Sequence, residues 1–286
     1  MGNLLFGTAG VPRSAGEPHT IPGLERIKEL GLGAMELEFV QGVRMGETLA
    51  KEVNQKRQEL GLTLTVHAPY FINLNAKEPA KIEASKKRIY DSCRIGALCG
   101  AINVTFHAGF YLGDPPEQTF QVIKKNLNDI IQRLKNDKID IRLTPELTGK
   151  ASQFGSLEEL IRLAKELRRD RDSELPIGMC IDFSHLHARS AGKYNSYKEW
   201  TDVLKQIEKE VGAGFLKNLH IHTSGIKYSV KGEQEHLNLP ESDMKYQELL
   251  KALKEYEVGG VLICESPNLE EDALLMKSYY ESLATD

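Results

Sequence analysis

Eight short apolar segments alternate with eight segments of helical periodicity along the 286-residue chain. The apolar segments have the length and residue types of buried strands. The expected strands are Leu4–Thr8, Ala34–Phe39, Thr63–His67, Ile102–His107, Ile139–Leu143, Ile177–Asp182, Leu216–His222 and Gly260–Cys264. The expected helices are Pro22–Leu30, Glu47–Leu60, Ala80–Cys99, Glu117–Leu134, Leu157–Leu167, Tyr197–Val211, Met244–Tyr256 and Leu269–Leu283. This alternation limits the possible folds, because helices that connect successive strands produce a parallel sheet.

Eight parallel strands close into a barrel whose interior can be filled by side chains. No linker rich in proline or serine divides the chain, so we expect a single domain over residues 1–286, folded as a (β/α)8 TIM barrel. The alternative is an open, doubly wound sheet, which requires a glycine-rich phosphate-binding turn after the first strand. Residues 7–12, GTAGVP, are a poor version of that turn, and we favour the barrel.

The composition excludes several classes of protein. The chain has 37 basic and 41 acidic residues, a net charge of −4, so no overall basic surface indicates a nucleic-acid partner, although a local patch stays open. We expect no membrane partner, because no apolar run approaches the ~20 residues of a membrane span. The N-terminus lacks the basic region of a signal peptide, and the four cysteines form no CxxC pair. We therefore expect a reducing, cytoplasmic compartment.

Ionisable residues stand at or just beyond the ends of six successive expected strands, where barrel enzymes place their sites. These residues are His67, His107, Glu146, Asp182, His185, His220, His236 and Glu265. Burying so many ionisable groups without a cation would carry a large desolvation cost. Imidazole and carboxylate are ligands of zinc and other borderline divalent ions. The pattern therefore predicts a metal centre.

The number of candidate ligands indicates more than one ion. A single tetrahedral or octahedral ion takes four to six ligands, whereas eight candidate residues converge here. We expect two or three ions, with a carboxylate bridging two of them. Ions about 4 Å apart are typical of phosphoryl-transfer hydrolysis.

The segments that carry these residues resemble endonuclease IV, the zinc-dependent apurinic/apyrimidinic endonuclease family of the xylose isomerase-like barrels. The resemblance covers nearly the whole chain. The matching segments are residues 67–74 (HAPYFINL), 106–109 (FHAG), 145–150 (PELTGK), 178–185 (GMCIDFSH), 219–220 (LH) and 264–265 (CE). They are specific as a set, although no single one is.

The resemblance implies zinc as the cofactor, with manganese as an alternative, and three groups of ligands. These are His67 with His107, then Asp182 with His220 and Glu265, then His185 with His236. Glu146 would bridge the first two groups, and Glu146 and Glu265 would be the catalytic carboxylates. Members of the family hydrolyse the phosphodiester 5′ to an abasic site and leave a 3′-hydroxyl.

The resemblance also implies a partner, DNA with abasic or oxidised sites. We expect a monomer, because a rim that faces DNA needs no partner subunit. Tyr70 matches a position that packs into DNA near the extruded lesion. Arg44, in the loop after the second strand, is a candidate for an inserted arginine, and Lys150 is a candidate phosphate contact. A sugar without a base is cheap to extrude because little stacking is lost.

Two departures from the family pattern leave alternatives open. Gln234 stands where the family has an aspartate, two residues before His236, so either Glu233 or Glu235 substitutes or the third site is weaker. His222 shares a strand face with His220. We expect it to be a hydrogen-bonding residue behind the ligands, with an additional site group as the alternative.

Two other functions are compatible with the pattern. A sugar isomerase or epimerase of the same superfamily would hold one manganese or magnesium ion with Glu146, Asp182, His220 and Glu265. The four remaining histidine ligands would then be surplus, which favours the nuclease. A non-catalytic metal-binding protein is the third possibility, and a complete ring of ligands at a barrel mouth argues against it.

Overall fold

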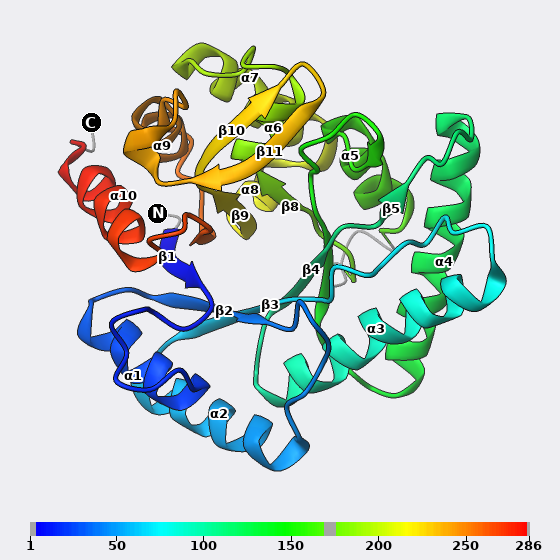
Figure 1. The fold of residues 1–286 in the computed structure, drawn as a ribbon, viewed down its shortest axis with the longest axis horizontal. Coiled ribbons are helices and arrows are strands. Elements are labelled where there is room, and N and C mark those ends of the chain that lie inside the picture. Colours follow the sequence, from blue (N-terminus) through cyan, green and yellow to red (C-terminus); the bar gives the residue numbers. More distant parts are fainter. Residues whose placement is uncertain (1–3, 169–175, 285–286) are drawn as a thin grey trace. The chain divides into compact units, whose positions relative to one another are not determined.

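The computed structural model describes residues 4–168 and 176–284 of the chain. Eight strands form one sheet in the order β6-β4-β3-β2-β1-β12-β9-β8 (Figure 1). These strands are β1 (Leu4–Ala9), β2 (Ala34–Glu38), β3 (Thr63–His67), β4 (Asn103–Phe106), β6 (Arg142–Pro145), β8 (Cys180–Asp182), β9 (Leu219–Thr223) and β12 (Gly260–Cys264). Parallel bridges join the two ends of this order, pairing Leu143 with Ile177 and Glu146 with Cys180. The ring of parallel strands confirms the predicted (β/α)8 barrel.

Helices follow the strands, as the alternation predicts. They are α1 (Thr20–Glu29), α2 (Glu47–Leu60), α3 (Pro79–Leu98), α4 (Pro116–Asn136), α5 (Leu157–Glu166), α6 (Phe183–Arg189), α7 (Tyr197–Val211), α8 (Ala213–Leu216), α9 (Tyr246–Glu255) and α10 (Glu270–Ser282), with a 3₁₀ turn at Leu239–Glu241. Local chemistry fixes several helix ends. Ser156 and Glu159 form a capping box at the start of α5, and Gly61 ends α2 with a positive φ of 67°. In the described ranges no helix is both long and apolar enough to cross a bilayer.

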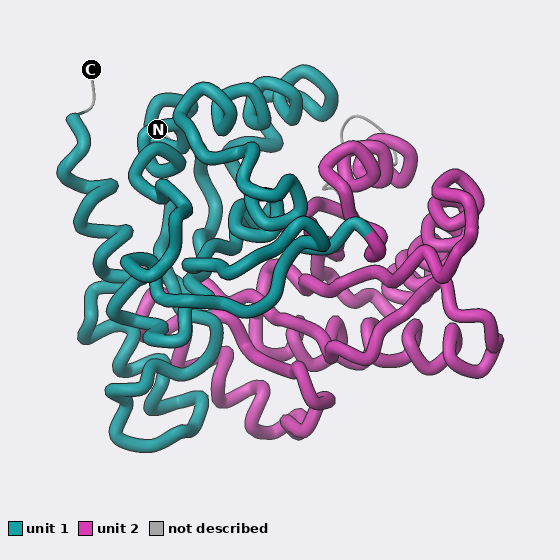
Figure 2. Tube along the Cα trace, turned by 45° about the horizontal axis from the view of Figure 1, so that its top comes forward, with its two compact units in different colours: residues 1–35, 149–151, 181–286 teal, residues 36–148, 152–180 magenta. Residues whose placement is uncertain are grey.

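The chain divides into two compact units (Figure 2). Unit 1 comprises residues 1–35, 149–151 and 181–286, and unit 2 comprises residues 36–148 and 152–180. Two of the boundaries fall inside β2 and β8, and the other two flank residues 149–151. In unit 1, Val261 and Ile263 of β12 pack with Ala34 in a buried apolar cluster. In unit 2, Val66 and Val104 lie opposite each other on β3 and β4, and both are fully buried.

Four expected strands begin later than predicted, the fourth by one residue and the fifth, sixth and seventh by three residues each. The cause is visible for the fifth and the seventh. The sequence predicts the fifth strand from Ile139, but the Ile139 N–H donates to Leu134 O and closes the end of α4, so β6 starts at Arg142. The seventh strand is expected from Leu216, but Leu216 ends the short helix α8, and β9 starts at Leu219. A short apolar run has the same appearance in a strand and in a buried helical turn, which explains both errors.

Three local elements lie where the sequence indicated only loops. The helix α6 follows β8 directly, and it carries His185. The strands β10 (Gly225–Ser229) and β11 (Gly232–Leu237) form an antiparallel hairpin that carries His236. The two-residue strands β5 (Gly109–Phe110) and β7 (Gln153–Phe154) pair in unit 2.

Candidate metal centre

The first cluster lies in unit 2 at the ends of three strands of the barrel. His67 ends β3, and His107 and Glu146 directly follow β4 and β6. Their ligand atoms all lie within 4.8 Å of one another. The Oε2 atom of Glu146 is 3.3 Å from His67 Nε2 and 3.1 Å from His107 Nε2. The structure thus brings together the three residues that the resemblance assigns to the first ion and its bridge.

The electrostatics of His67 suit an exchange of a proton for a cation. Its Nδ1 lies 2.7 Å from the Ala68 carbonyl oxygen, which directs Nε2 toward Glu146. Burial alone would lower the pKa of His67, but the hydrogen bond to Glu146 and the charges of Glu146, Glu38 and Glu36 outweigh it and raise this pKa to about 10. The carboxylates therefore favour a positive charge at this position, supplied either by the imidazolium or by a metal ion.

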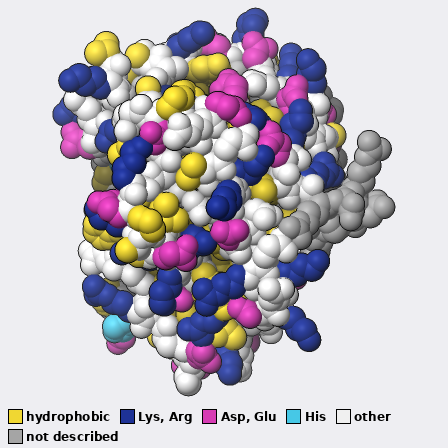
Figure 3. All heavy atoms as spheres, turned by 90° about the vertical axis from the view of Figure 1, so that its right-hand side faces the viewer, with side chains coloured by type: hydrophobic (Ala, Val, Ile, Leu, Met, Phe, Trp, Pro, Cys, Tyr) yellow, Lys and Arg dark blue, Asp and Glu magenta, His cyan; other side chains and the backbone are white. Residues whose placement is uncertain are grey.

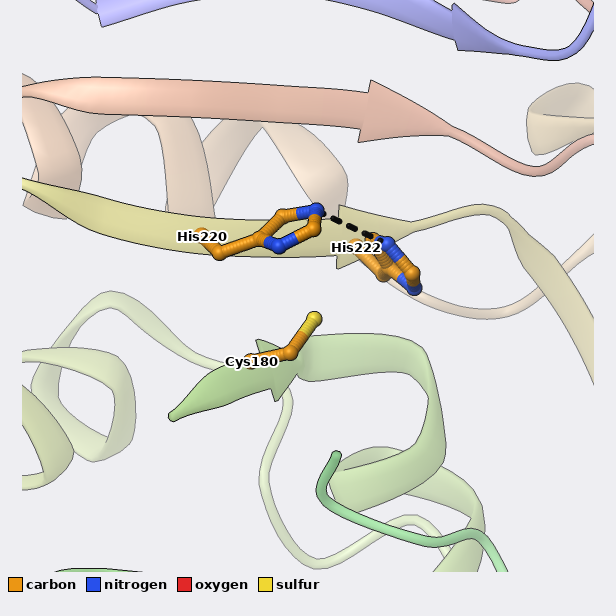
Figure 4. Close-up of side chains that lie close together, drawn as sticks. All are labelled: Cys180, His220 and His222. Atoms are coloured by element: carbon orange, nitrogen blue, oxygen red, sulfur yellow. Dashed lines mark hydrogen bonds between the residues drawn. The ribbon is translucent and has the colours of Figure 1, made fainter. Parts of the chain in front are cut away.

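The second cluster lies in unit 1 and contains Asp182, His222 and Glu265, whose ligand atoms are also within 4.8 Å of one another. His222 Nδ1 is 3.3 Å from Glu265 Oε1. The other ring nitrogen of His222 lies 3.2 Å from His220 Nε2, as the dashed line in Figure 4 marks. His222 therefore lies beside the carboxylates, and His220 is hydrogen-bonded behind it, one pleat deeper in β9. Cys180, also drawn in Figure 4, is buried.

The third cluster, also in unit 1, contains His185, Glu233 and His236. His185 Nε2 is 3.5 Å from Glu233 Oε2, and His236 Nε2 is 4.0 Å from Glu233 Oε1. Asp182 orients His185 twice, because its Oδ1 accepts from the His185 backbone N–H at 2.7 Å and its Oδ2 lies 3.2 Å from Nδ1. Asp182 is thus the N-cap of α6 as well as a member of the second cluster.

A β-bulge selects Glu233 for this cluster. Lys227 pairs with Glu235, and the next residue, Tyr228, pairs with Glu233, so Gln234 is the extra residue of the hairpin. Glu235 points outward and forms an exposed ion pair with Lys227 at 2.8 Å. Without the bulge, Glu233 and His236, three residues apart, would lie on opposite faces of the strand. The bulge puts both on the face toward His185.

The donor sets of all three clusters fit a borderline divalent ion. Burial is the main cause that lowers the pKa of His236, and the charge of His185 adds to it, so His236 offers a neutral imidazole. Imidazole nitrogens and carboxylate oxygens are ligands of zinc and manganese. The residues present therefore fit the cofactors that the sequence predicts.

The three candidate DNA contacts differ in their surroundings. Tyr70 is 60% exposed, and its ring centre lies 5.3 Å from that of His67, in an edge-on arrangement. Lys150 is half-buried, and its carbonyl oxygen accepts from Arg189 Nη1 at 2.6 Å. Arg44 is exposed between β2 and α2. The structure brings only Tyr70 among these three into ring contact with a predicted ligand.

Sequence reasoning missed two carboxylates on β2. Glu36 is fully buried and accepts from Thr65 Oγ1 at 2.7 Å, while Glu38 lies two residues further on. The Phe39 N–H donates to His67 O at 2.9 Å, so β2 runs beside the end of β3. Two glutamates spaced by two within an apolar strand were a visible signal, because this period directs both to one face.

Comparison with known proteins identifies the family of the chain. A family profile described as xylose isomerase-like TIM barrel matches residues 24–281. The uncharacterized protein MJ0133 of Methanocaldococcus jannaschii is 44% identical over 279 residues, covering 97% of each chain. A protein named probable endonuclease 4 from Bacillus subtilis is 28% identical over 229 residues, covering 78% of this chain and 73% of the relative.

Two solved structures show the same fold. Endonuclease IV from Thermus thermophilus superposes with a TM-score of 0.71 at 20% identity, covering 96% of this chain and all of the other. A D-tagatose 3-epimerase-like protein gives the same TM-score and identity, covering 96% and 97%. The two structures are named for different activities, so the fold does not separate a nuclease from an epimerase. The chain belongs to the xylose isomerase-like TIM barrel family.

Proposed function

We propose that the protein is a phosphodiesterase of DNA repair that uses two or three divalent ions, zinc or manganese, and cuts DNA 5′ to an abasic or oxidised site to leave a 3′-hydroxyl. One observation supports this proposal above the others. The three imidazole–carboxylate clusters contain more ligands than a one-ion isomerase uses. The likeness to proteins named probable endonuclease 4 agrees with it.

In this proposal His67 and His107 hold one ion, and Asp182, His222 and Glu265 hold a second. Glu146 would be the ligand shared by the two ions, as the resemblance to endonuclease IV implies. His220 takes the place behind His222. When bound, the ions supply Lewis-acid charge that stabilises the attacking and leaving oxygens of a phosphoryl transfer.

The protein's own groups hold and orient this centre. The Ala68 carbonyl fixes the ring of His67, and His220 fixes the ring of His222 through their facing nitrogens. Glu146 and Glu265 set the charge around the scissile phosphate and are the proposed catalytic carboxylates. Tyr70 packs against the nucleotide beside the extruded sugar.

The net charge of −4 gives the protein no overall attraction to DNA, so in this proposal individual residues at the barrel rim contact the substrate. On the face drawn in Figure 3, basic and acidic side chains are interspersed. Tyr70, Arg44 and Lys150 are the proposed DNA contacts. Few phosphate contacts predict a shallow dependence of binding on salt, because each contact releases about one counterion.

The test is a labelled duplex with a single tetrahydrofuran abasic analogue, incubated with protein and zinc or manganese and separated on a denaturing gel. We expect a cut 5′ to the analogue that leaves a 3′-hydroxyl, absent in Glu146→Gln and retained in Glu235→Gln. The second variant makes the same chemical change in the exposed Lys227 ion pair. An intact duplex with both metals would overturn the proposal.

One observation favours a second candidate, a sugar isomerase or epimerase. Glu36 and Glu38 add negative charge near His67, which suits a hydroxyl-rich, uncharged substrate better than a phosphodiester. This enzyme would need one manganese or magnesium ion. Turnover of a ketose with one ion per chain would support it, and two or more bound ions without such turnover would exclude it.

A further inference from the structure

The β10–β11 hairpin, which carries Glu233 and His236 of the third cluster, also contacts α6 at a second place. His185 and His187 are two residues apart on α6, about 200° around the helix axis, so they leave it on different sides. His185 lies near Glu233, whereas the ring of His187 lies 4.9 Å from that of Tyr228, edge-on. Tyr228 belongs to β10 of the hairpin.

Asp243 connects these two rings by hydrogen bonds. The Tyr228 hydroxyl donates to Asp243 Oδ2 at 2.8 Å, and Asp243 Oδ1 lies 2.9 Å from Nε2 of the fully buried His187. The other nitrogen of His187 lies 2.8 Å from the Tyr194 carbonyl oxygen. The ring is thus held at both nitrogens, and Tyr228–Asp243–His187 forms one continuous chain, called the latch below.

The turn after α6 is shaped to admit the tyrosine. Gly192 has a φ of +84°, and a Cβ atom there would lie 2.4 Å from the Tyr228 hydroxyl oxygen. Only glycine meets both the backbone and the space requirement. The close approach of Tyr228 to this turn therefore requires glycine at position 192.

The latch acts on the third cluster through the strand register. Tyr228 is the direct cross-strand partner of Glu233, next to the bulge at Gln234. Residues directly opposite in an antiparallel pair share a face. Holding Tyr228 against α6 therefore also holds Glu233 against His185 on the same helix.

We propose that Tyr228 and Asp243 are positioning residues that keep Glu233 in ligand geometry and so determine how firmly the third cluster retains its cation. This inference rests on the proposed metal centre, but not on the reaction or the substrate. The pKa shifts of Tyr228 and Asp243 agree with this positioning role. Burial and the bond to Asp243 raise the pKa of Tyr228 to about 12, which keeps its hydroxyl a donor. Burial alone would raise the pKa of Asp243, yet the bonds from His187 and Tyr228 hold it below its ordinary value.

The test compares zinc retention in wild-type protein, Tyr228→Phe and Asp243→Asn. After the protein is loaded with zinc, plasma mass spectrometry gives the number of zinc ions per chain. The rate of zinc release to a chromogenic chelator is then measured. Glu233→Gln identifies which release phase belongs to the third cluster. We expect that phase to quicken about tenfold in Tyr228→Phe, the lower end of what changes behind metal ligands produce. The phases of the other ions stay unchanged.

Tyr197→Phe is the matched control, because it removes another tyrosine–carboxylate hydrogen bond of unit 1, to Glu255 on α9. Thermal unfolding in excess chelator should be similar for Tyr228→Phe and this control. An unchanged third phase in both latch variants would overturn the inference, and so would an equal acceleration in Tyr197→Phe. Wild-type protein with two ions would overturn the inference alone, whereas a single ion would overturn the proposed function as well.

Discussion

The first and third clusters contain similar ligands but are built in different ways. His67, His107 and Glu146 stand at the ends of neighbouring barrel strands, whose register fixes where each side chain lies. Glu233 and His236 stand on a hairpin outside the barrel, and they face His185 only because of a bulge. A site at strand ends follows from the pleat of the sheet, whereas a site on a hairpin depends on one inserted residue and on the latch. We therefore expect the two clusters to differ in their tolerance to substitution.

The largest difference should appear between Glu146→Gln and Glu233→Gln. Glu146 contacts both histidines of the first cluster, so its loss should lower the cleavage rate by about 10³-fold or more, the scale of losing a central charge-stabilising group. Glu233→Gln should lower the rate about tenfold, because the other two clusters remain. Rates on the abasic duplex at saturating zinc measure both. Equal losses of rate in the two variants would show that the first and third clusters do not act independently in the reaction.

Removal of the bulge is the next largest change. Deletion of Gln234 restores a regular hairpin and turns Glu233 away from His185. The third ion should be lost while the other ions stay, as counted by plasma mass spectrometry. Gln234→Ala keeps the bulge and serves as the control. If both variants keep the same number of ions, the bulge does not select the ligand.

The two histidines of β9 sharpen the account of the second cluster. His222→Ala should abolish retention of the second ion, because His222 lies beside Glu265. His220→Ala should weaken retention only about tenfold, because His220 acts through the ring of His222. Zinc titration of each variant distinguishes them. The reverse order would restore the assignment that the resemblance implies.

The last prediction concerns the pH dependence of stability at the first cluster. The pKa of His67 is raised from 6.5 to about 10. The folded metal-free protein therefore gains stability from His67 that is complete below pH 6.5 and is lost as pH rises through about 10, at no more than about 1.4 kcal/mol per pH unit. Thermal unfolding in chelator at pH 7 and pH 9.5 should show this loss, and His67→Gln should reduce it. His19→Gln, at an exposed position before α1, should keep the full loss.

The barrel and the residues at the strand ends could be predicted from the sequence, because both depend on the short spacing at which apolar residues repeat in strands and helices. Strands β3 and β12 begin and end at the predicted residues, and His67, His107 and Glu146 do lie together. The family comparison confirms the fold and the family. The ligand roles of these residues stay predictions.

The features of the site that were not predicted depend on strand pairing and register, which the spacing of apolar residues does not determine. The bulge at Gln234 and the register of the hairpin arise from the pairing of β10 with β11. The depth of His220 and His222 was not separable, because both share one strand face. Asp182 as the cap of α6 was recoverable, since an aspartate before a short apolar helix is a typical helix start.

The most direct measurement combines metal content and cleavage on one preparation. The protein is loaded with zinc and freed of excess metal, and the number of zinc ions per chain is measured. The same preparation is then assayed on the duplex with the abasic analogue. The account predicts two or three ions per chain and a cut 5′ to the analogue that leaves a 3′-hydroxyl. One ion per chain, an intact duplex and turnover of a ketose would contradict it and identify the protein as an isomerase or epimerase.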